Sequence, residues 1–228
     1  MFARIAPRYD LANDVLSLGI HRNWREKVLN AGEIGPGHHV LDLCTGTGDL
    51  AFAIAKRVTR SGYVAGVDFV NEMVQLATKK LKTRANSALN SAPISFMQGD
   101  ALALPFSDQS FDRCTVSFGI RNVDSPVNGL REMERVLKPQ GKAVVLEFGQ
   151  PTAPGFSSAY QLYSKFLMPT IGGLLTGDRA AYEYLPRTSK NFPCGENFCA
   201  IMREAGFRNC KFKSLSLGIA YLYVGDKG

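Results

Sequence analysis

The segment Val40-Leu-Asp-Leu-Cys-Thr-Gly-Thr-Gly-Asp49 decides the fold. Its apolar start predicts a buried strand over 40–43, and the two glycines that follow predict a tight turn. The apolar spacing of residues 50–58 predicts a helix after the turn. A glycine turn between a strand and a helix lets a ligand approach the backbone at an electropositive helix N-terminus. The segment therefore predicts a βα unit of a parallel sheet with a ligand site at its turn.

Outward from this segment, short apolar runs alternate with amphipathic stretches, as is typical of βα units. Strands are predicted over 40–43, 63–67, 94–97, 111–118 and 143–148, and helices over 11–29, 50–58, 71–81, 127–137 and 196–205. Residues 210–217 and 219–224 alternate, which predicts two antiparallel strands at the sheet edge. We therefore expect one α/β domain over 1–228 with a seven-stranded, mostly parallel sheet. Residues 1–34 would form an N-terminal helical lid, and the Pro- and Tyr-rich residues 150–194 a helical insertion.

The amino-acid composition excludes several classes of protein. The chain has 228 residues, 45% hydrophobic and 21% charged, which is ordinary for a globular domain and excludes a disordered or disulfide-stapled chain. The net charge of +7 can attract nucleic acid or an anionic membrane. The five cysteines form no C-x-x-C pair, so we expect no disulfide, no metal site and a reducing, cytoplasmic location. No apolar run reaches the roughly 20 residues of a membrane span, and Asp10 and Asp14 interrupt any secretory signal.

Two cofactor classes fit the glycine turn. The string 46–51 satisfies G-x-G-x-x-A, the loose dinucleotide pattern of nicotinamide enzymes. Asp68 ends the second predicted strand, where a carboxylate accepts hydrogen bonds from ribose in either class. Asp42 before the turn and Asp100 after the third strand favour S-adenosylmethionine, which carries a cation and no phosphate. A hydride-transfer enzyme would also need a catalytic Tyr/Lys or His system, which the sequence does not supply in recognisable form.

We therefore expect S-adenosylmethionine as the cofactor, with its adenine at Asp100. The predicted cofactor site consists of Gly46, Thr47, Asp68, Asp100, Ala101 and Ser117. Thr47 belongs to the turn, Ala101 would lie at the adenine and Ser117 near the methionine end.

Several further sequence blocks match one enzyme family, and Ser117–Val123 is the most specific of them for that family. The others are 2–10, 13–14, 17–22 with Trp24, 41–50, 99–101, 104–106, 135–139 and 146–148. With these blocks the chain resembles the class I S-adenosylmethionine-dependent methyltransferases. More narrowly, it resembles the ubiquinone/menaquinone biosynthesis C-methyltransferases almost end to end. Cys44 stands where such enzymes often have a glycine, and Asp100 where many have Asn; both residues suit the site. The family usually has residues before this first block, so we expect a short or trimmed form.

The resemblance implies a lipid quinol substrate with an isoprenoid tail. Its ring carbon becomes nucleophilic when a hydroxyl of ordinary pKa ~10 ionises, which a nearby cation favours. We expect Arg121 to be that cation, Asn122 to orient the ring hydroxyl, and Tyr9 with Asp10 to cover the pocket. The aromatic stretch Tyr160–Tyr184 would line the tail or face a membrane, although packing onto the sheet also explains it. We expect transient contact with the inner membrane surface.

Nucleic acid is not expected as a partner. The Asp- or Asn-Pro-Pro-aromatic signature of amino methylation is absent after the fourth strand. The pair Pro193-Cys194 resembles that of RNA cytosine methyltransferases but lies in the insertion, away from a strand end. Two alternatives stay open: a methyltransferase for another small molecule or nucleic acid, and a non-catalytic cofactor- or lipid-binding subunit. The ring type, the tail length and assembly as a homo-oligomer or quinone-synthesis complex are also open.

Overall fold

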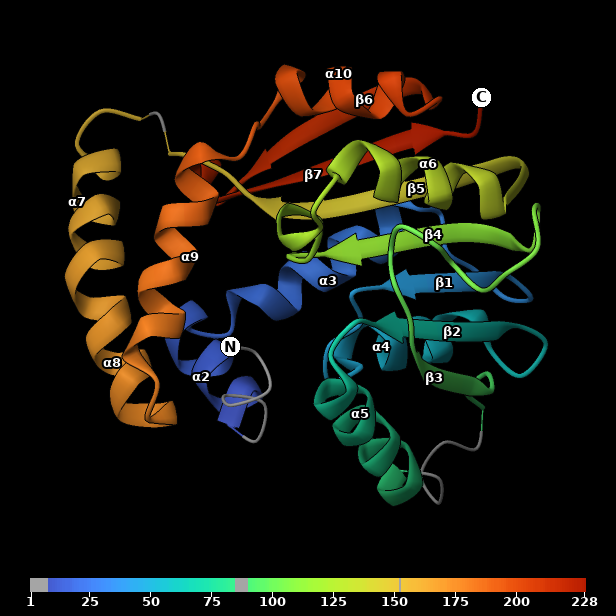
Figure 1. Cartoon of the computed structure of the whole chain (residues 1–228), viewed down its shortest axis with the longest axis horizontal. Coiled ribbons are helices and arrows are strands. Elements are labelled where there is room, and N and C mark those ends of the chain that lie inside the picture. The colour runs from blue at the N-terminus through green and yellow to red at the C-terminus, as the bar shows by residue number, and fades with distance from the viewer. Residues whose placement is uncertain (1–7, 85–89, 152) are drawn as a thin grey trace.

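A seven-stranded sheet forms the centre of the molecule (Figure 1). The computed structural model describes residues 8–84, 90–151 and 153–228. The strand order is β3-β2-β1-β4-β5-β7-β6. The strands are β1 His39–Leu43, β2 Tyr63–Asp68, β3 Ile94–Gln98, β4 Phe111–Ser117, β5 Leu137–Phe148, β6 Arg208–Leu215 and β7 Ala220–Asp226. The first five are parallel, and β7 pairs antiparallel with both β5 and β6, which confirms the predicted fold class.

Helices cover both faces of the sheet (Figure 1), so the inner parallel strands β1, β2 and β4 are mostly buried, whereas the edge strand β3 is only partly so. The helices are α2 Tyr9–Ser17, α3 Ile20–Ala31, α4 Asp49–Val58, α5 Asn71–Arg84, α6 Pro126–Val136, α7 Phe156–Leu162, α8 Met168–Thr176, α9 Arg179–Asn191 and α10 Glu196–Glu204. Short helical turns are η3 Ile120–Asn122, η4 Tyr163–Leu167 and η5 Ser216–Gly218. Apolar residues of α3 and α4 pack in one core cluster, and those of α6 and α10 pack in a second.

The start of β5 differs from the prediction. A helix to residue 137, a Pro-Gln-Gly turn and a strand from 143 were expected, but β5 begins directly at Leu137. Phe111 pairs with Leu137 and Arg113 with Lys142, so the turn residues form a wide bulge inside the strand. Gln140 within it has a φ of 66°. A bulge accommodates extra residues without ending the pairing, which a local turn signal does not distinguish from a loop.

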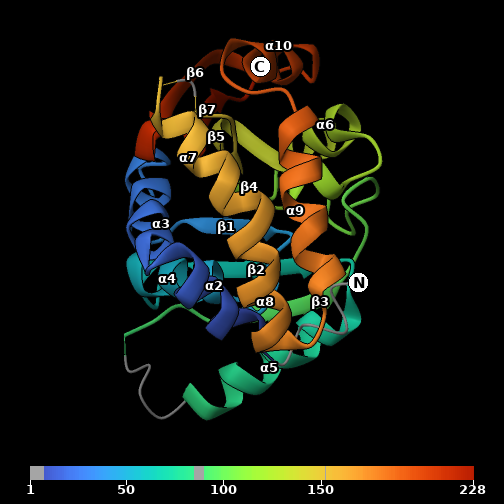
Figure 2. The same cartoon turned by 90° about the vertical axis from the view of Figure 1, so that its left-hand side faces the viewer.

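The N-terminal region and the insertion pack on each other. Ala12 of α2 is buried against Met168, Ala181 and Tyr182 of α8 and α9. In Figure 1 the arrowheads of the parallel strands point toward α7, α8 and α9, and Figure 2 shows these helices with α2 across the strand ends. The insertion therefore lies over the carboxyl edge of the sheet, where open α/β sheets bind ligands.

Candidate functional site

A cavity of about 630 Å³ lies where the insertion meets the carboxyl ends of β1 and β4. One side consists of the glycine turn and strand ends, with Asp42, Cys44, Thr45, Gly46, Thr47, Asp49, Ser117, Phe118 and Arg121. The opposite side is mainly apolar, with Phe156, Ala159, Tyr160, Tyr163, Met168, Ile171, Ala181, Tyr182 and Tyr184. The cavity thus joins a polar turn to an apolar wall.

The turn requires its glycines. Gly46 and Gly48 have φ angles of 57° and 84°, in the left-handed region that other residues rarely adopt. A Cβ added to Gly48 would run into the Phe96 ring, whereas one added to Gly46 would meet nothing within 4 Å. The backbone at Gly46 is therefore open to a ligand.

Cys44 keeps the backbone that a glycine would adopt at this position. Its φ is 53°, and its side chain packs against Gly119 on the turn after β4. The small size of cysteine preserves the cavity wall, as expected, but the residue carries a conformational strain that the sequence does not reveal.

Asp42 is a buried carboxylate near the end of β1. Its carboxylate accepts hydrogen bonds from the hydroxyls of Thr45 and Thr115, both at 2.7 Å. Burial raises the pKa of Asp42 to about 6, and the two hydroxyl hydrogen bonds partly oppose that shift. Because Asp42 lines the cavity, a cationic ligand group there would favour its charged form.

The predicted ribose and adenine residues lie beside this cavity rather than in it. Asp68 accepts hydrogen bonds from the backbone N–H groups of Gly46 at 2.8 Å and Val70 at 2.9 Å. Asp100 is exposed after β3 and accepts one from the N–H of Leu102 at 2.9 Å. The structure brings these strand ends together, since the Gly99 N–H donates to the Asp68 carbonyl at 3.0 Å.

Sequence reasoning missed Phe69, which follows Asp68 directly. Its side chain is 70% exposed, a large value for a phenylalanine. Ala101, which follows β3, is buried. The signal was present in the sequence: an aromatic residue immediately after a strand-ending carboxylate offers an apolar surface beside the position predicted for the ribose.

Arg121 lies at the cavity in a buried ion pair. Its Nη1 donates to Glu147 Oε1 and to the Phe118 carbonyl, both at 2.6 Å, and the Arg121 and Glu147 side chains are 4% and 1% exposed. Its Nε is buried without a hydrogen-bond partner among the described residues. Arg121, the predicted cation, therefore lines the cavity with its charge compensated by Glu147, and its catalytic role stays a prediction. Sequence reasoning missed Glu147, although a carboxylate inside the apolar run 143–148 was a signal.

Of the other predicted site residues, some line the cavity and some lie around it. Ser117 Oγ is buried at the cavity, again without a partner in the described part of the chain. Asn122 lies behind the cavity wall and accepts a 3.2 Å hydrogen bond from the Tyr184 hydroxyl. Thr47 donates to Asp10 Oδ1 at 2.6 Å, which connects the turn to α2. Tyr9 begins α2, and its side chain lies outside the described part of the chain.

Two of these features fit S-adenosylmethionine. The open backbone at Gly46 suits a ligand laid along the turn, and the unpaired Ser117 hydroxyl suits its polar amino-acid end. No group of three or more His, Cys, Asp or Glu placed to hold a metal occurs within 8–84, 90–151 and 153–228. The fold is that of the class I S-adenosylmethionine-dependent methyltransferases, and the residues of the site fit that cofactor.

Comparison with known proteins narrows this class. The model of the ubiE/COQ5 methyltransferase family matches residues 1–227, and the chain belongs to that family. It is 46% identical over 226 residues to the ubiquinone/menaquinone biosynthesis C-methyltransferase UbiE of Bdellovibrio bacteriovorus, covering 99% of this chain and 93% of the relative. It is 40% identical to the demethylmenaquinone methyltransferase of Staphylococcus carnosus, covering 100% of this chain and 91% of that one. The protein is accordingly an S-adenosylmethionine-dependent C-methyltransferase.

The fold agrees with that assignment. An S-adenosylmethionine-dependent methyltransferase from Aquifex aeolicus superposes with a TM-score of 0.64 at 20% identity, covering 90% of this chain and 89% of that structure.

Proposed function

We propose that this enzyme methylates a ring carbon of a demethyl quinol that carries an isoprenoid tail. Demethylmenaquinol and 2-polyprenyl-6-methoxy-1,4-benzoquinol are the two candidate rings, in keeping with the names of the relatives in B. bacteriovorus and S. carnosus. The observation that carries the proposal is the shape of the cavity, which runs from the glycine turn into an apolar wall. A quinol ring at the turn would leave its tail on that wall.

Arg121 supports the chemistry of ring methylation. When bound, S-adenosylmethionine supplies an electrophilic methyl group at the turn. The unpartnered Nε–H of Arg121 can donate to a quinol oxygen, which lowers the pKa of that hydroxyl and favours the nucleophilic phenolate. Glu147 holds the guanidinium in place. Asn122 acts through Tyr184, whose ring lines the cavity, so its role is to position that ring.

The test of Arg121 uses a double variant, because Arg121→Ala alone would strand the buried Glu147 carboxylate. Breaking a buried pair costs about 3–5 kcal/mol, whereas replacing both partners with apolar residues is often neutral. We expect Arg121→Met/Glu147→Leu to fold and bind S-adenosylmethionine in calorimetry, with methyl transfer to quinol reduced at least about 100-fold. Lys142→Met/Glu33→Leu removes an ion pair on the far half of β5 and should retain activity. Full turnover by the first variant would refute the assigned role.

The substrate is tested separately. Labelled S-adenosylmethionine is supplied with each demethyl quinol, and the product is identified by mass spectrometry. Methylation of neither ring, with turnover on another small molecule or a nucleic acid, would favour the second candidate class. Cofactor binding without turnover on any substrate would favour a non-catalytic subunit.

We further propose that the enzyme reaches its lipid substrate at a membrane surface. No helix among the described residues is long and apolar enough to cross a membrane. Large apolar side chains are nevertheless exposed on the packed layer of α2 and the insertion: Leu11, Val15, Leu18, Ile20, Leu162, Phe166, Leu167 and Leu174. This layer also walls the cavity, so the apolar surface lies beside the proposed tail site. The segment Tyr160–Tyr184 supplies only half of this surface, and the α2 region supplies the rest.

A further inference from the structure

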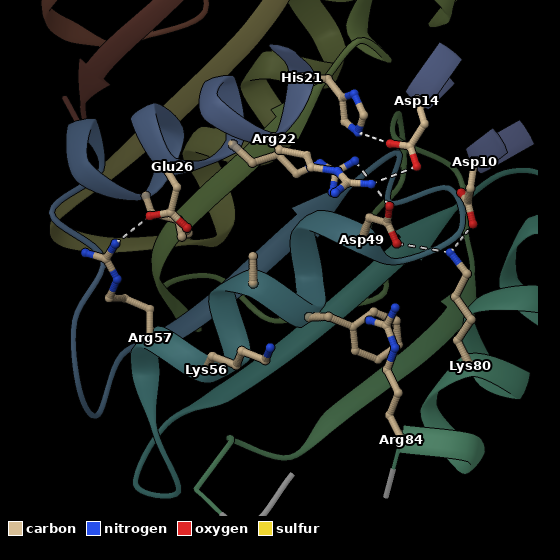
Figure 3. A pocket seen from close by; sticks show the side chains of 14 residues that line it. Asp10, Asp14, His21, Arg22, Glu26, Asp49, Lys56, Arg57, Lys80 and Arg84 are labelled. Atoms are coloured by element: carbon tan, nitrogen blue, oxygen red, sulfur yellow. Dashed lines mark hydrogen bonds and ion pairs between the residues drawn. The ribbon is translucent and has the colours of Figure 1, made fainter. Parts of the chain in front are cut away.

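A second cavity of about 610 Å³ adjoins the first, and its lining is mostly charged (Figure 3). It lies among α2, α3, α4 and α5 and is lined by side chains such as Arg22, Glu26 and Lys56. Asp10, His21, Arg25 and Asp49 line both cavities and form the partition between them. His21 is therefore a titratable group between an apolar pocket and a charged one.

The His21 ring is bonded at both nitrogens. Nδ1 lies 2.5 Å from the hydroxyl oxygen of Ser17, which lines the apolar cavity. Nε2 lies 3.2 Å from Asp14 Oδ1, which lines the charged cavity (Figure 3). The His21 side chain is 10% exposed and that of Asp14 is 39% exposed. The three side chains form a hydrogen-bonded line from the apolar cavity toward solvent.

Counting hydrogens shows that this line fits both protonation states of His21. Ser17 Oγ also lies 2.6 Å from the Asn13 carbonyl, but its single hydrogen can serve only one acceptor at a time. When Ser17 donates to Nδ1, His21 is neutral and Nε2–H donates to Asp14. When Ser17 donates to Asn13, Nδ1–H donates to Ser17 and Nε2–H still donates to Asp14, so the ring is charged. The heavy atoms need not move between the two states.

We propose that Ser17, His21 and Asp14 carry away the proton that ring methylation releases, an inference that rests on the proposed function. The quinol hydroxyl proton passes to Ser17 Oγ while the Ser17 hydrogen passes to His21 Nδ1. The ring carbon's electron pair then forms the bond to the methyl group as the carbon–sulfur bond breaks and its electrons stay on sulfur. The hydrogen displaced from that carbon reprotonates the oxygen and restores the aromatic ring. One proton per turnover remains on His21 Nδ1, with the charged ring stabilised by Asp14, until the product leaves the cavity. It then passes back through Ser17 to water, which restores the neutral ring protonated on Nε2.

The groups around His21 favour its neutral form, which can accept a proton. Burial lowers its pKa from the ordinary value of 6.5, and Arg25 and Arg22 on α3 act in the same direction. Asp14 on α2 and Asp49 on α4 oppose the shift. The lowered pKa favours the neutral ring, and Asp14 stabilises the charged ring that forms during turnover.

The kinetic test compares pH–rate profiles of quinol methylation. His21→Gln keeps a hydrogen-bonding side chain that cannot titrate; its kcat should fall about 100-fold and the acid limb of the profile should disappear. Ser17→Ala should also lower kcat, because it interrupts the line. His39→Gln, an exposed histidine at the opposite end of β1, should match the wild type. A His21→Gln enzyme with the wild-type rate and acid limb would overturn the proposal.

A second measurement needs no substrate and no variant. Nitrogen NMR of the histidine rings should show His21 titrating below 6.5, with its neutral form protonated on Nε2. Titration above 6.5, or a neutral form protonated on Nδ1, would overturn the relay even if quinol methylation is confirmed. If the wild type methylates no quinol while the ring behaves as expected, the proposed function has failed and the relay loses the reaction it was assigned to serve.

Discussion

At the scale of single residues, Asp42 shows how burial sets a charge at the cofactor turn. Its pKa is about 6 in the folded protein against an ordinary value of 3.8. A group whose pKa is raised on folding favours the folded state below its unfolded pKa, and this contribution is lost as pH rises through the folded pKa. Ionisation of Asp42 should therefore lower the stability of the fold progressively from about pH 4 to about pH 6, and the loss persists at higher pH.

We expect Asp42→Asn to stabilise the protein at pH 8 by up to about 3 kcal/mol and to change it little at pH 4. The amide removes the buried charge while keeping polar contacts to Thr45 and Thr115. The variant should also bind cationic S-adenosylmethionine more weakly. Urea unfolding at both pH values and calorimetry measure the two effects. An equal loss of stability at both pH values would contradict this account of Asp42.

The side chain that position 119 can accept depends on the size of the side chain at position 44. A Cβ on Gly119 would collide with the Cys44 side chain, although the Gly119 φ of −115° suits any residue. Gly119→Ala should destabilise the fold by about 1–3 kcal/mol through overpacking. Adding Cys44→Gly should recover most of that loss, because it removes the collision and the unfavourable φ of 53°. Urea unfolding of both single variants and the double variant forms the cycle, and additive effects would show that the two positions do not interact.

At the scale of elements, polar contacts hold α2 in addition to its apolar packing on α8 and α9. Asp10 accepts a hydrogen bond from Thr47 and pairs with Lys80 at 2.5 Å. The hydroxyl of Tyr163 donates to the Leu16 carbonyl at 2.7 Å. Lys80 also pairs with Asp49 at 3.0 Å, so α2, α4 and α5 meet at one ammonium group (Figure 3). Since Thr47 belongs to the cofactor turn, the position of α2 depends on that turn.

We expect Asp10→Ala to loosen α2 without unfolding the sheet. Amide hydrogen exchange over residues 10–17 should accelerate at least about tenfold, since the lost contacts are worth about 1.5–3 kcal/mol. Bound S-adenosylmethionine should slow the same amides in the wild type. Glu183→Ala, which breaks an exposed pair with Arg179 on α9, should leave them unchanged. Unaltered exchange in Asp10→Ala would mean that apolar packing alone holds α2.

At the scale of the whole molecule, most of the large exposed apolar side chains lie on the layer of α2 and the insertion, whereas Phe69, Phe212 and Leu217 lie elsewhere. Leu18 and Leu174 are 86% and 80% exposed, the highest values among the large apolar residues described. They belong to the α2 and α8 regions, which pack on each other. An exposed apolar layer of this kind marks an interaction surface, and the net charge of +7 favours an anionic one.

We expect the enzyme to sediment with vesicles that contain anionic lipid and to release them in part at high salt. Leu18→Asp/Leu174→Asp should weaken this binding at least tenfold, because burying one such side chain is worth about 1.5–3 kcal/mol. Ser61→Asp/Ser107→Asp adds the same charge on exposed loops before β2 and β4, at the other edge of the sheet, and should bind nearly as the wild type does. Equal weakening by both pairs would show that only net charge matters.

The sequence by itself determined the fold class and the cofactor turn. Strand and helix periods are local, and the residues of the turn at 44–48 are contiguous. The carboxyl ends of parallel strands share one edge, so the order of strands and helices along the chain is enough to place Asp68 and Asp100 together. Phe69 and Glu147 could also have been predicted as site residues, because each stands out locally: an aromatic residue after a strand-ending carboxylate, and a carboxylate inside an apolar strand.

Only the tertiary structure decided how the charges of the site are balanced. Arg121 and Glu147 come from different strand ends, and neither residue's local pattern reveals that they pair at 2.6 Å. The packing of α2 on the insertion joins residues near 12 to residues near 168 and 182. That packing also makes His21 part of a partition between two cavities. Such contacts follow from how preformed elements fill space together, and side-chain periodicity along the chain carries no record of them.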